Sequence, residues 1–172
     1  QANNNDIKIG RQKINTPLSG SDDARMLPNL FEAIVLKNNT LDNTTLIATH
    51  INKESVGSFG NVYGTPSQLS LQSGYGLGYK LGSSGNFVDM GDVALGSGTE
   101  TNGVTACAVV YKGIPNLTLK AWDYYAHNIL NAIYLQSDYK FSVDYTKMKL
   151  SAQYITQSEN GDELAGKVDS NY

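Results

Sequence analysis

Two neighbouring segments near the C-terminal end alternate between apolar and polar residues for about ten residues each. In the first segment, Ala132 to Phe141, one parity carries Ile133, Leu135, Ser137, Tyr139 and Phe141, and the other carries Tyr134, Gln136, Asp138 and Lys140. In the second segment, one parity carries Met148, Leu150, Ala152 and Tyr154, and the other carries Lys147, Lys149, Ser151 and Gln153. Strands of soluble domains usually have about five or six residues, whereas a tilted strand needs about ten to cross a bilayer. The two segments therefore predict membrane-spanning strands.

Five further segments, with less regular alternation, are strand candidates. They are Ile7 to Ile14, Phe31 to Asn38, Thr44 to Lys53, Val104 to Lys112 and Leu117 to His127. Every second connection, beginning with Asn39 to Asn43, is short. Asn15 to Leu30 and Glu54 to Gly103 are the long connections, and a local hairpin is expected within the second of them. Short turns at one end and long loops at the other are typical of outer-membrane barrels.

About seven strands do not make a closed barrel, because bacterial single-chain barrels use even numbers from eight upward. An open sheet would leave two unpaired edges in lipid. The sequence therefore predicts an all-β fold, an antiparallel transmembrane β-barrel of which residues 1–172 form one part, as an internal fragment of a larger barrel. In this arrangement, residues 54–103 form a long extracellular loop.

Composition and motifs exclude several other classes of protein. Charged residues make up 17% of the chain, and its net charge of −3 is scattered, so no basic face for nucleic acid is expected. The single cysteine, Cys107, excludes an internal disulfide framework and a CxxC metal site. His50 and His127 are isolated, and no catalytic or phosphate-binding motif accompanies them. The interpretation is a protein that is not an enzyme and needs no cofactor or metal.

Several stretches resemble the OprD family of outer-membrane porins, particularly its epsilonproteobacterial members. The clearest is IGRQKINTPLSGSDDARMLPNLFEA, residues 9–33, with the recurring core Asp23, Arg25, Pro28 and Phe31. Three later stretches match in the family's order: LDNTTLIATHI, NLTLKAWDYYAHNILNAIYLQSDYKF and SAQYITQSENGDELAGKVD. The resemblance covers roughly two-thirds of the chain, and the glycine-rich part of the 54–103 region lies outside it.

The resemblance implies a location in the outer membrane of a Gram-negative bacterium. It also implies an aqueous channel for passive, moderately selective diffusion of small hydrophilic solutes, anionic or zwitterionic. The partners would be these solutes and the lipid bilayer, and assembly as a homo-oligomer is left open. The loop 15–30 would fold inward and narrow the pore, with Asp22, Asp23 and Arg25 at the constriction. Arg25 suits this role because its planar cation can pair a carboxylate bidentately; a structural ion pair with Asp23 is the alternative.

The polar parities of the strands supply the candidate pore-lining residues. They are Lys8, Gln12, Tyr134, Gln136, Asp138, Lys140, Lys147 and Lys149. The lysines would form a basic track for anions, and a solvated wall with no role in selectivity is the plainer interpretation. The rival hypothesis is a surface-exposed β-rich binding or adhesion protein, which strand length separates from the barrel: strands of about five or six residues favour the rival.

Overall fold

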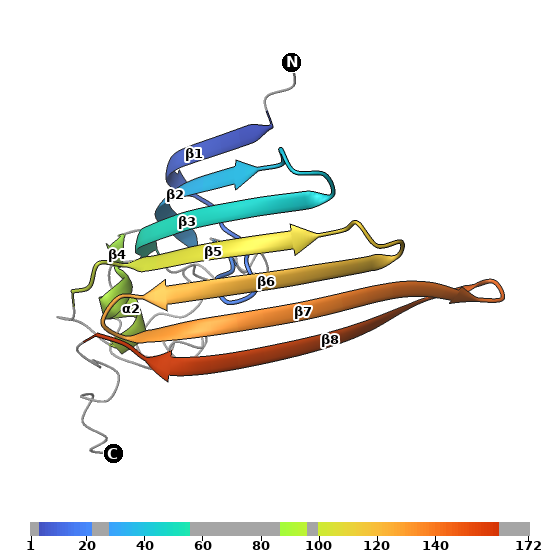
Figure 1. The fold of residues 1–172 in the computed structure, drawn as a ribbon. Coiled ribbons are helices and arrows are strands. Elements are labelled where there is room, and N and C mark those ends of the chain that lie inside the picture. The colour runs from blue at the N-terminus through green and yellow to red at the C-terminus, as the bar shows by residue number, and fades with distance from the viewer. Residues whose placement is uncertain (1–3, 22–27, 56–86, 96–99, 162–172) are drawn as a thin grey trace, which may run out of the picture.

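Seven long strands form one antiparallel sheet in the computed structural model (Figure 1). The structure describes residues 4–21, 28–55, 87–95 and 100–161. The long strands are β1 (Asn5–Gln12), β2 (Leu30–Asn38), β3 (Thr44–Ser55), β5 (Val104–Tyr111), β6 (Leu117–Ala126), β7 (Leu130–Val143) and β8 (Thr146–Glu159). A short strand, β4 (Val88–Asp89), pairs with the end of β3 and leads directly into the helix α2 (Met90–Leu95). Among the described residues, no helix is long and apolar enough to span a membrane.

The strands pair with their neighbours in chain order, from β1 to β8, so the sheet is an up-and-down meander. The sheet curves into an arc, and its two outer strands, β1 and β8, have no partner on their free edge among the described residues (Figure 1). Most of the strands are longer than the five or six residues expected of a soluble sandwich, and β7 and β8 reach 14 residues each. Strand length therefore disfavours the rival hypothesis.

Short connections at both ends of the sheet contain an Asn or Asp with a positive φ. These residues are Asn43, Asn116, Asn128 and Asp144, with φ between 52° and 64°. Asn and Asp adopt this left-handed conformation at lower cost than other residues with side chains. The turn between β7 and β8 is the tightest of these, because Val143 still pairs with Thr146 in the ladder.

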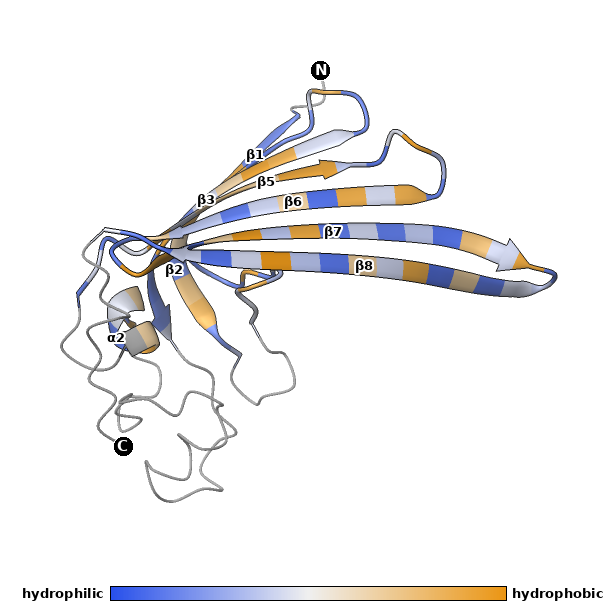
Figure 2. Cartoon of the chain, turned by 60° about the horizontal axis from the view of Figure 1, so that its bottom comes forward, coloured by the Kyte–Doolittle hydropathy of each residue, from blue (hydrophilic) through white to orange (hydrophobic). Residues whose placement is uncertain are grey.

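The outward face of the sheet carries a broad band of exposed apolar side chains. Its members include Ile7, Ile9, Ile34, Leu36, Leu46, Val109, Leu119, Ile133, Leu135, Leu150 and Tyr154. A contiguous apolar surface of this extent marks contact with a partner or a membrane, and it is the band expected on the lipid side of a barrel. Figure 2 shows the alternation as bands of opposite hydropathy along β7 and β8.

The opposite face, called here the inner face, carries the buried residues of the strands. One cluster, formed by Ala106, Ala108, Trp122, Tyr124, Ala132 and Tyr134, lies on β5, β6 and β7. A second cluster joins β2 and β3 to residues outside the long strands: Ile14, Phe31, Ala33, Ile51 and Met90. Ile14 follows β1 and Met90 begins α2, so both segments pack against the inner face of the sheet. Figure 2 shows α2 beside the ends of the strands that lead to the long connections.

The long connection between β3 and β5 differs in part from the prediction. β3 continues to Ser55, and the region also holds β4 and α2, which the sequence pattern did not indicate. A register shift between Glu32 and Ala33 on β2 lets β3 accommodate one extra residue and continue pairing with β2 beyond Lys53. The local hairpin expected within this connection is not seen in its described part, and residues 56–86, where the alternating pattern lies, are outside the described residues.

Candidate pore wall

The cross-strand register decides which charged side chains share the inner face. Six lysines lie on this face, spread over five strands: Lys8, Lys37, Lys120, Lys140, Lys147 and Lys149. Four acidic residues accompany them: Asp6, Glu54, Asp138 and Glu159. The inner face of the described strands is therefore basic, although the whole chain has a net charge of −3.

All eight residues that the sequence singled out by parity lie on the inner face. β1 contributes Lys8 and Gln12, β7 contributes Tyr134, Gln136, Asp138 and Lys140, and β8 contributes Lys147 and Lys149. They do not form one group, because β1 and β7 stand at distant positions in the sheet. On β1, the Gln12 amide donates a hydrogen bond of 3.0 Å to the carbonyl oxygen of Ala33 on β2.

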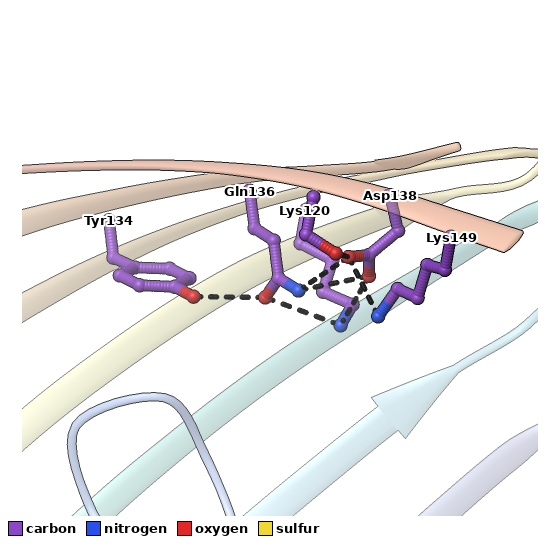
Figure 3. Close-up of polar contacts among 6 residues, drawn as sticks. Lys120, Tyr134, Gln136, Asp138 and Lys149 are labelled. Atoms are coloured by element: carbon purple, nitrogen blue, oxygen red, sulfur yellow. Dashed lines mark hydrogen bonds and ion pairs between the residues drawn. The ribbon is translucent and has the colours of Figure 1, made fainter. Parts of the chain in front are cut away.

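Tyr134, Gln136, Asp138 and Lys149 meet in a polar cluster around Asp138 (Figure 3). Lys140 and Lys147 share the inner face but lie nearer the turn between β7 and β8, outside this cluster. The Lys149 ammonium lies 2.9 Å from Oδ1 of Asp138, and the Lys120 ammonium lies 3.4 Å from Oδ2. The Ser151 hydroxyl donates a hydrogen bond of 2.7 Å to Oδ1. We call Lys120, Tyr134, Gln136, Asp138, Lys149 and Ser151 the Asp138 cluster.

A second tier of hydrogen bonds extends the Asp138 cluster along β7. The Gln136 amide nitrogen lies 2.9 Å from both carboxylate oxygens of Asp138, and the Tyr134 hydroxyl donates to the Gln136 carbonyl oxygen at 2.9 Å. The Lys120 ammonium also contacts that amide oxygen, at 3.4 Å. The cluster therefore fixes side chains from three adjacent strands in one arrangement on the inner face.

Sequence reasoning missed Lys120, which is central to this cluster. Lys120 lies on β6 opposite Gln136. Its parity on β6 also carries Trp122 and Tyr124, so the pattern did not identify a polar face. Both aromatic residues are buried on the inner face, and their rings stack with centroids 5.5 Å apart. Aromatic residues favour strands in either environment, so their presence alone does not reveal the face.

The described part of the loop after β1 packs against the inner face. Ile14 is buried against Phe31 and Ala33, and the Thr16 side chain and the Leu18 backbone lie beside the Tyr124 hydroxyl. Asn15 anchors the fold of this segment, because its side-chain oxygen accepts hydrogen bonds from the backbone and the hydroxyl of Ser21.

Asn29, near the end of the same loop, is also held by hydrogen bonds to the start of the loop. The Asn29 amide donates to the carbonyl oxygen of Gly20 at 3.0 Å, and the Asn29 backbone N–H donates to that of Ser21 at 2.7 Å. The start and the end of the loop are thus tied together on the inner side. The three residues expected at the constriction, Asp22, Asp23 and Arg25, lie outside the described residues.

Arg11 stands on the outward face, where a charge next to lipid would be unfavourable. It lies at the end of β1 that leads into the long loop, its guanidinium is 3.6 Å from the Glu32 carboxylate, and it stacks over the ring of Phe87 at 4.3 Å. An outward charge at this end of the strand is compatible with a position at the membrane boundary.

Comparisons with known proteins agree with this architecture. The model of a family described as outer membrane porin, OprD family, matches residues 1–172. Among solved structures, Pseudomonas aeruginosa OccK8 (OprE) is similar, with a TM-score of 0.69, 17% identity and coverage of 92% of this chain and 34% of that chain. P. aeruginosa OpdK has a TM-score of 0.72 and 16% identity, with coverage of 94% and 37%. P. aeruginosa OccK2 (OpdF) has a TM-score of 0.72 and 18% identity, with coverage of 95% and 38%.

The chain thus spans between 34% and 38% of the length of these three porins, which agrees with an arc of a larger barrel. A search among curated proteins gave no significant match. The structural likeness concerns the fold, and the family model covers the whole chain. The chain belongs to the OprD family of outer membrane porins, and its curved sheet is part of an antiparallel β-barrel of the bacterial outer membrane.

Proposed function

We propose that the chain forms part of the wall of an aqueous channel through which small hydrophilic solutes diffuse passively, with a preference for anionic or zwitterionic solutes. The observation that carries the proposal is the contrast between the two faces of the same strands. The outward face is an exposed apolar band, whereas the inner face carries six lysines against four acidic residues. A basic wall raises the local concentration of anions in the channel. Nothing in this mechanism requires a catalytic step.

Among the strands that the structure describes, β1 and β8 each leave one edge unpaired, which supports the view that further strands complete the barrel. The backbone groups on the free edges of β1 and β8 need hydrogen-bond partners in lipid, and only a closed barrel supplies them. We therefore place the channel in the complete barrel that contains this arc.

The loop 15–30 is proposed as the constriction of this channel. Its described residues support the proposal, because the Thr16 side chain and the Leu18 backbone lie beside the Tyr124 hydroxyl on the inner face. Ile14, which directly precedes the loop, is buried on the same face. Arg25 would offer a bidentate cation to a passing carboxylate, with Asp22 and Asp23 beside it as the groups that meet an ammonium. Among the similar structures, OpdK has been solved with vanillate, a small aromatic carboxylate of the class we propose.

Single-channel current in a planar bilayer tests the proposal, using the complete barrel and the variant Arg25→Ala. We expect stable ohmic steps and a reversal potential that indicates anion preference, which decreases in the variant. Arg11→Ala is the matched control, because it removes the same side chain from the outward face and should leave selectivity unchanged. Steps unaffected by Arg25→Ala would leave the channel but remove the constriction role of Arg25. Correctly inserted protein that carries no current would contradict the channel itself.

A further inference from the structure

The Asp138 side chain occupies a site with the contacts that a free carboxylate would seek. Two ammonium groups, one hydroxyl and one amide nitrogen surround its two oxygens, at distances between 2.7 and 3.4 Å. The Asp138 side chain is 8% exposed, whereas the side chains of Lys120 and Lys149 are 31% and 50% exposed. The carboxylate is thus enclosed by its donors, while both cations stay accessible from the inner side of the sheet.

The backbone holds these donors in position. Asp138 pairs with Ser151 on β8 and with Thr118 on β6, so the carboxylate stands in the middle of three hydrogen-bonded strands. Lys120 and Lys149 reach it from the two neighbouring strands, one from each side. A solute carboxylate that entered this place would meet the same cations, but only if Asp138 were absent.

The net charge of the cluster depends on the Asp138 carboxylate, which the two lysines share. With Asp138 present, two lysines and one carboxylate leave a single positive charge, and both ammonium groups already have a counter-ion. Without it, two cations and two neutral donors would face the inner side with no counter-ion. A channel conducts well when its sites attract a solute but release it readily, and an unneutralised pair of this kind would favour retention.

We propose that Asp138 is a specificity-determining residue of the channel, a tethered counter-ion that occupies the carboxylate-binding positions of Lys120 and Lys149. Solute carboxylates are drawn to the lysine pair, but they compete with Asp138 and are not retained. The proposal rests on the proposed channel function, and it assigns to one acidic residue the control over how strongly the basic wall holds anions.

The test uses the complete barrel in planar bilayers, with reversal potentials in salt gradients and conductance as a function of potassium acetate concentration. In Asp138→Asn, we expect the anion-to-cation permeability ratio to increase by about two- to fivefold, the range of a partly exposed ion pair. The acetate concentration that gives half-maximal conductance should decrease, because acetate is held longer. Asp138→Glu keeps the charge and should stay close to the wild type.

Asp6→Asn is the matched control, because it removes one carboxylate from the same inner face on β1, far from the lysine pair. If Asp138→Asn and Asp6→Asn change both readouts equally, the effect is one of net charge and the proposal is overturned. A wild-type barrel that conducts while Asp138→Asn leaves both readouts unchanged would also overturn it, without affecting the channel. A wild-type barrel that carries no current overturns both.

A second pair of variants gives a result if Asp138→Asn does not insert. Asp138→Asn combined with Lys149→Met keeps one positive charge in the cluster, as in the wild type. Compared with Lys149→Met alone, we expect the double variant to show a higher anion preference, because Lys120 is then without its counter-ion. Equal reversal potentials in these two variants would overturn the proposal.

Discussion

The two faces of β7 carry side chains of the same strand into different environments. On the outward side, Ile133, Leu135 and Tyr139 are each between 41% and 44% exposed. On the inner side, Tyr134, Gln136 and Asp138 are bonded to one another and to side chains of β6 and β8. The outward face thus requires only an apolar surface of suitable width, whereas the inner face depends on particular partners at particular distances.

This difference predicts how each face responds to mutation. An apolar face that contacts lipid tolerates exchange among apolar residues but not a charge, because a charge cannot be solvated at the bilayer midplane. A charge added to a polar wall in contact with water has little effect on folding stability, but it changes which solutes the channel favours. Mutations on one strand, at adjacent positions, therefore separate stability from selectivity.

The largest expected effect comes from a charge placed in the outward band. Leu135→Arg should reduce the free energy of unfolding of the complete barrel by about 2–4 kcal/mol, the cost of an arginine near the midplane. Gln153→Arg, on the inner face of the neighbouring strand β8 where the Gln153 side chain is exposed, should leave stability nearly unchanged. Denaturant titration of the barrel folded in lipid vesicles measures both. A larger loss of stability in the inner-face variant than in Leu135→Arg would show that the face assigned to lipid is the one that faces water.

Charge reversal on the basic wall is expected to change selectivity rather than stability. Lys140 and Lys147 are exposed on the inner face near the turn between β7 and β8. The double variant Lys140→Glu with Lys147→Glu should reduce the anion-to-cation permeability ratio by about twofold or more in dilute salt, where screening is weak. The reversal potential in a salt gradient measures this ratio.

Lys112→Glu provides the control for the double reversal, because Lys112 follows the end of β5 and lies outside the paired strands. It should shift the reversal potential much less. A shift in Lys112→Glu as large as that in the double variant would show that selectivity reflects the charge of the whole chain rather than the inner face.

The contrast between the faces also explains which parts of the fold the sequence predicts. β7 and β8 extend far from the long loops, and over this part most of their inner residues are polar and alternate with outward residues that are mostly apolar. The parity of these two strands, and the six candidate pore-lining residues that they carry, follow from period two alone. The order of strands and the positions of the short turns follow from the same pattern, helped by the Asn and Asp residues at the turns.

β2 shows why the remaining part could not be predicted. Its outward residues Ile34 and Leu36 are apolar, and so are its inner residues Phe31 and Ala33. The inner residues are apolar because Ile14 of the loop and Met90 of α2 cover them. This covering depends on contacts between segments far apart in the sequence, which no local period contains. Lys120 was missed for the same reason, since the aromatic residues that share its parity are also buried on the inner face.

A smaller effect is expected from two tyrosines on opposite faces of β7. Tyr134→Phe removes the hydroxyl that donates to Gln136 and should cost about 1 kcal/mol of unfolding free energy, the usual net value of such a bond. Tyr139 lies on the outward face and is 44% exposed, so removal of its hydroxyl in Tyr139→Phe should change stability less. Denaturant titration compares the two. Equal losses would mean that the hydrogen bond to Gln136 contributes nothing measurable.

The smallest perturbation is a label on the natural cysteine, which reports the environment of a face directly. Cys107 is exposed on the outward side of β5, where it neighbours Ala48 and Asp123 across the ladder. A small fluorescent thiol reagent at Cys107 should change stability by less than about 0.5 kcal/mol, as is usual for exposed positions. Its emission should be quenched by nitroxide groups on lipid acyl chains and only weakly by iodide in water.

In the control, Cys107→Ser with Gln153→Cys, the label stands on the inner face of β8, and iodide should be the stronger quencher. If both positions respond to iodide alike, the outward face does not contact lipid at the level of Cys107, and the membrane boundary lies nearer to the short turns.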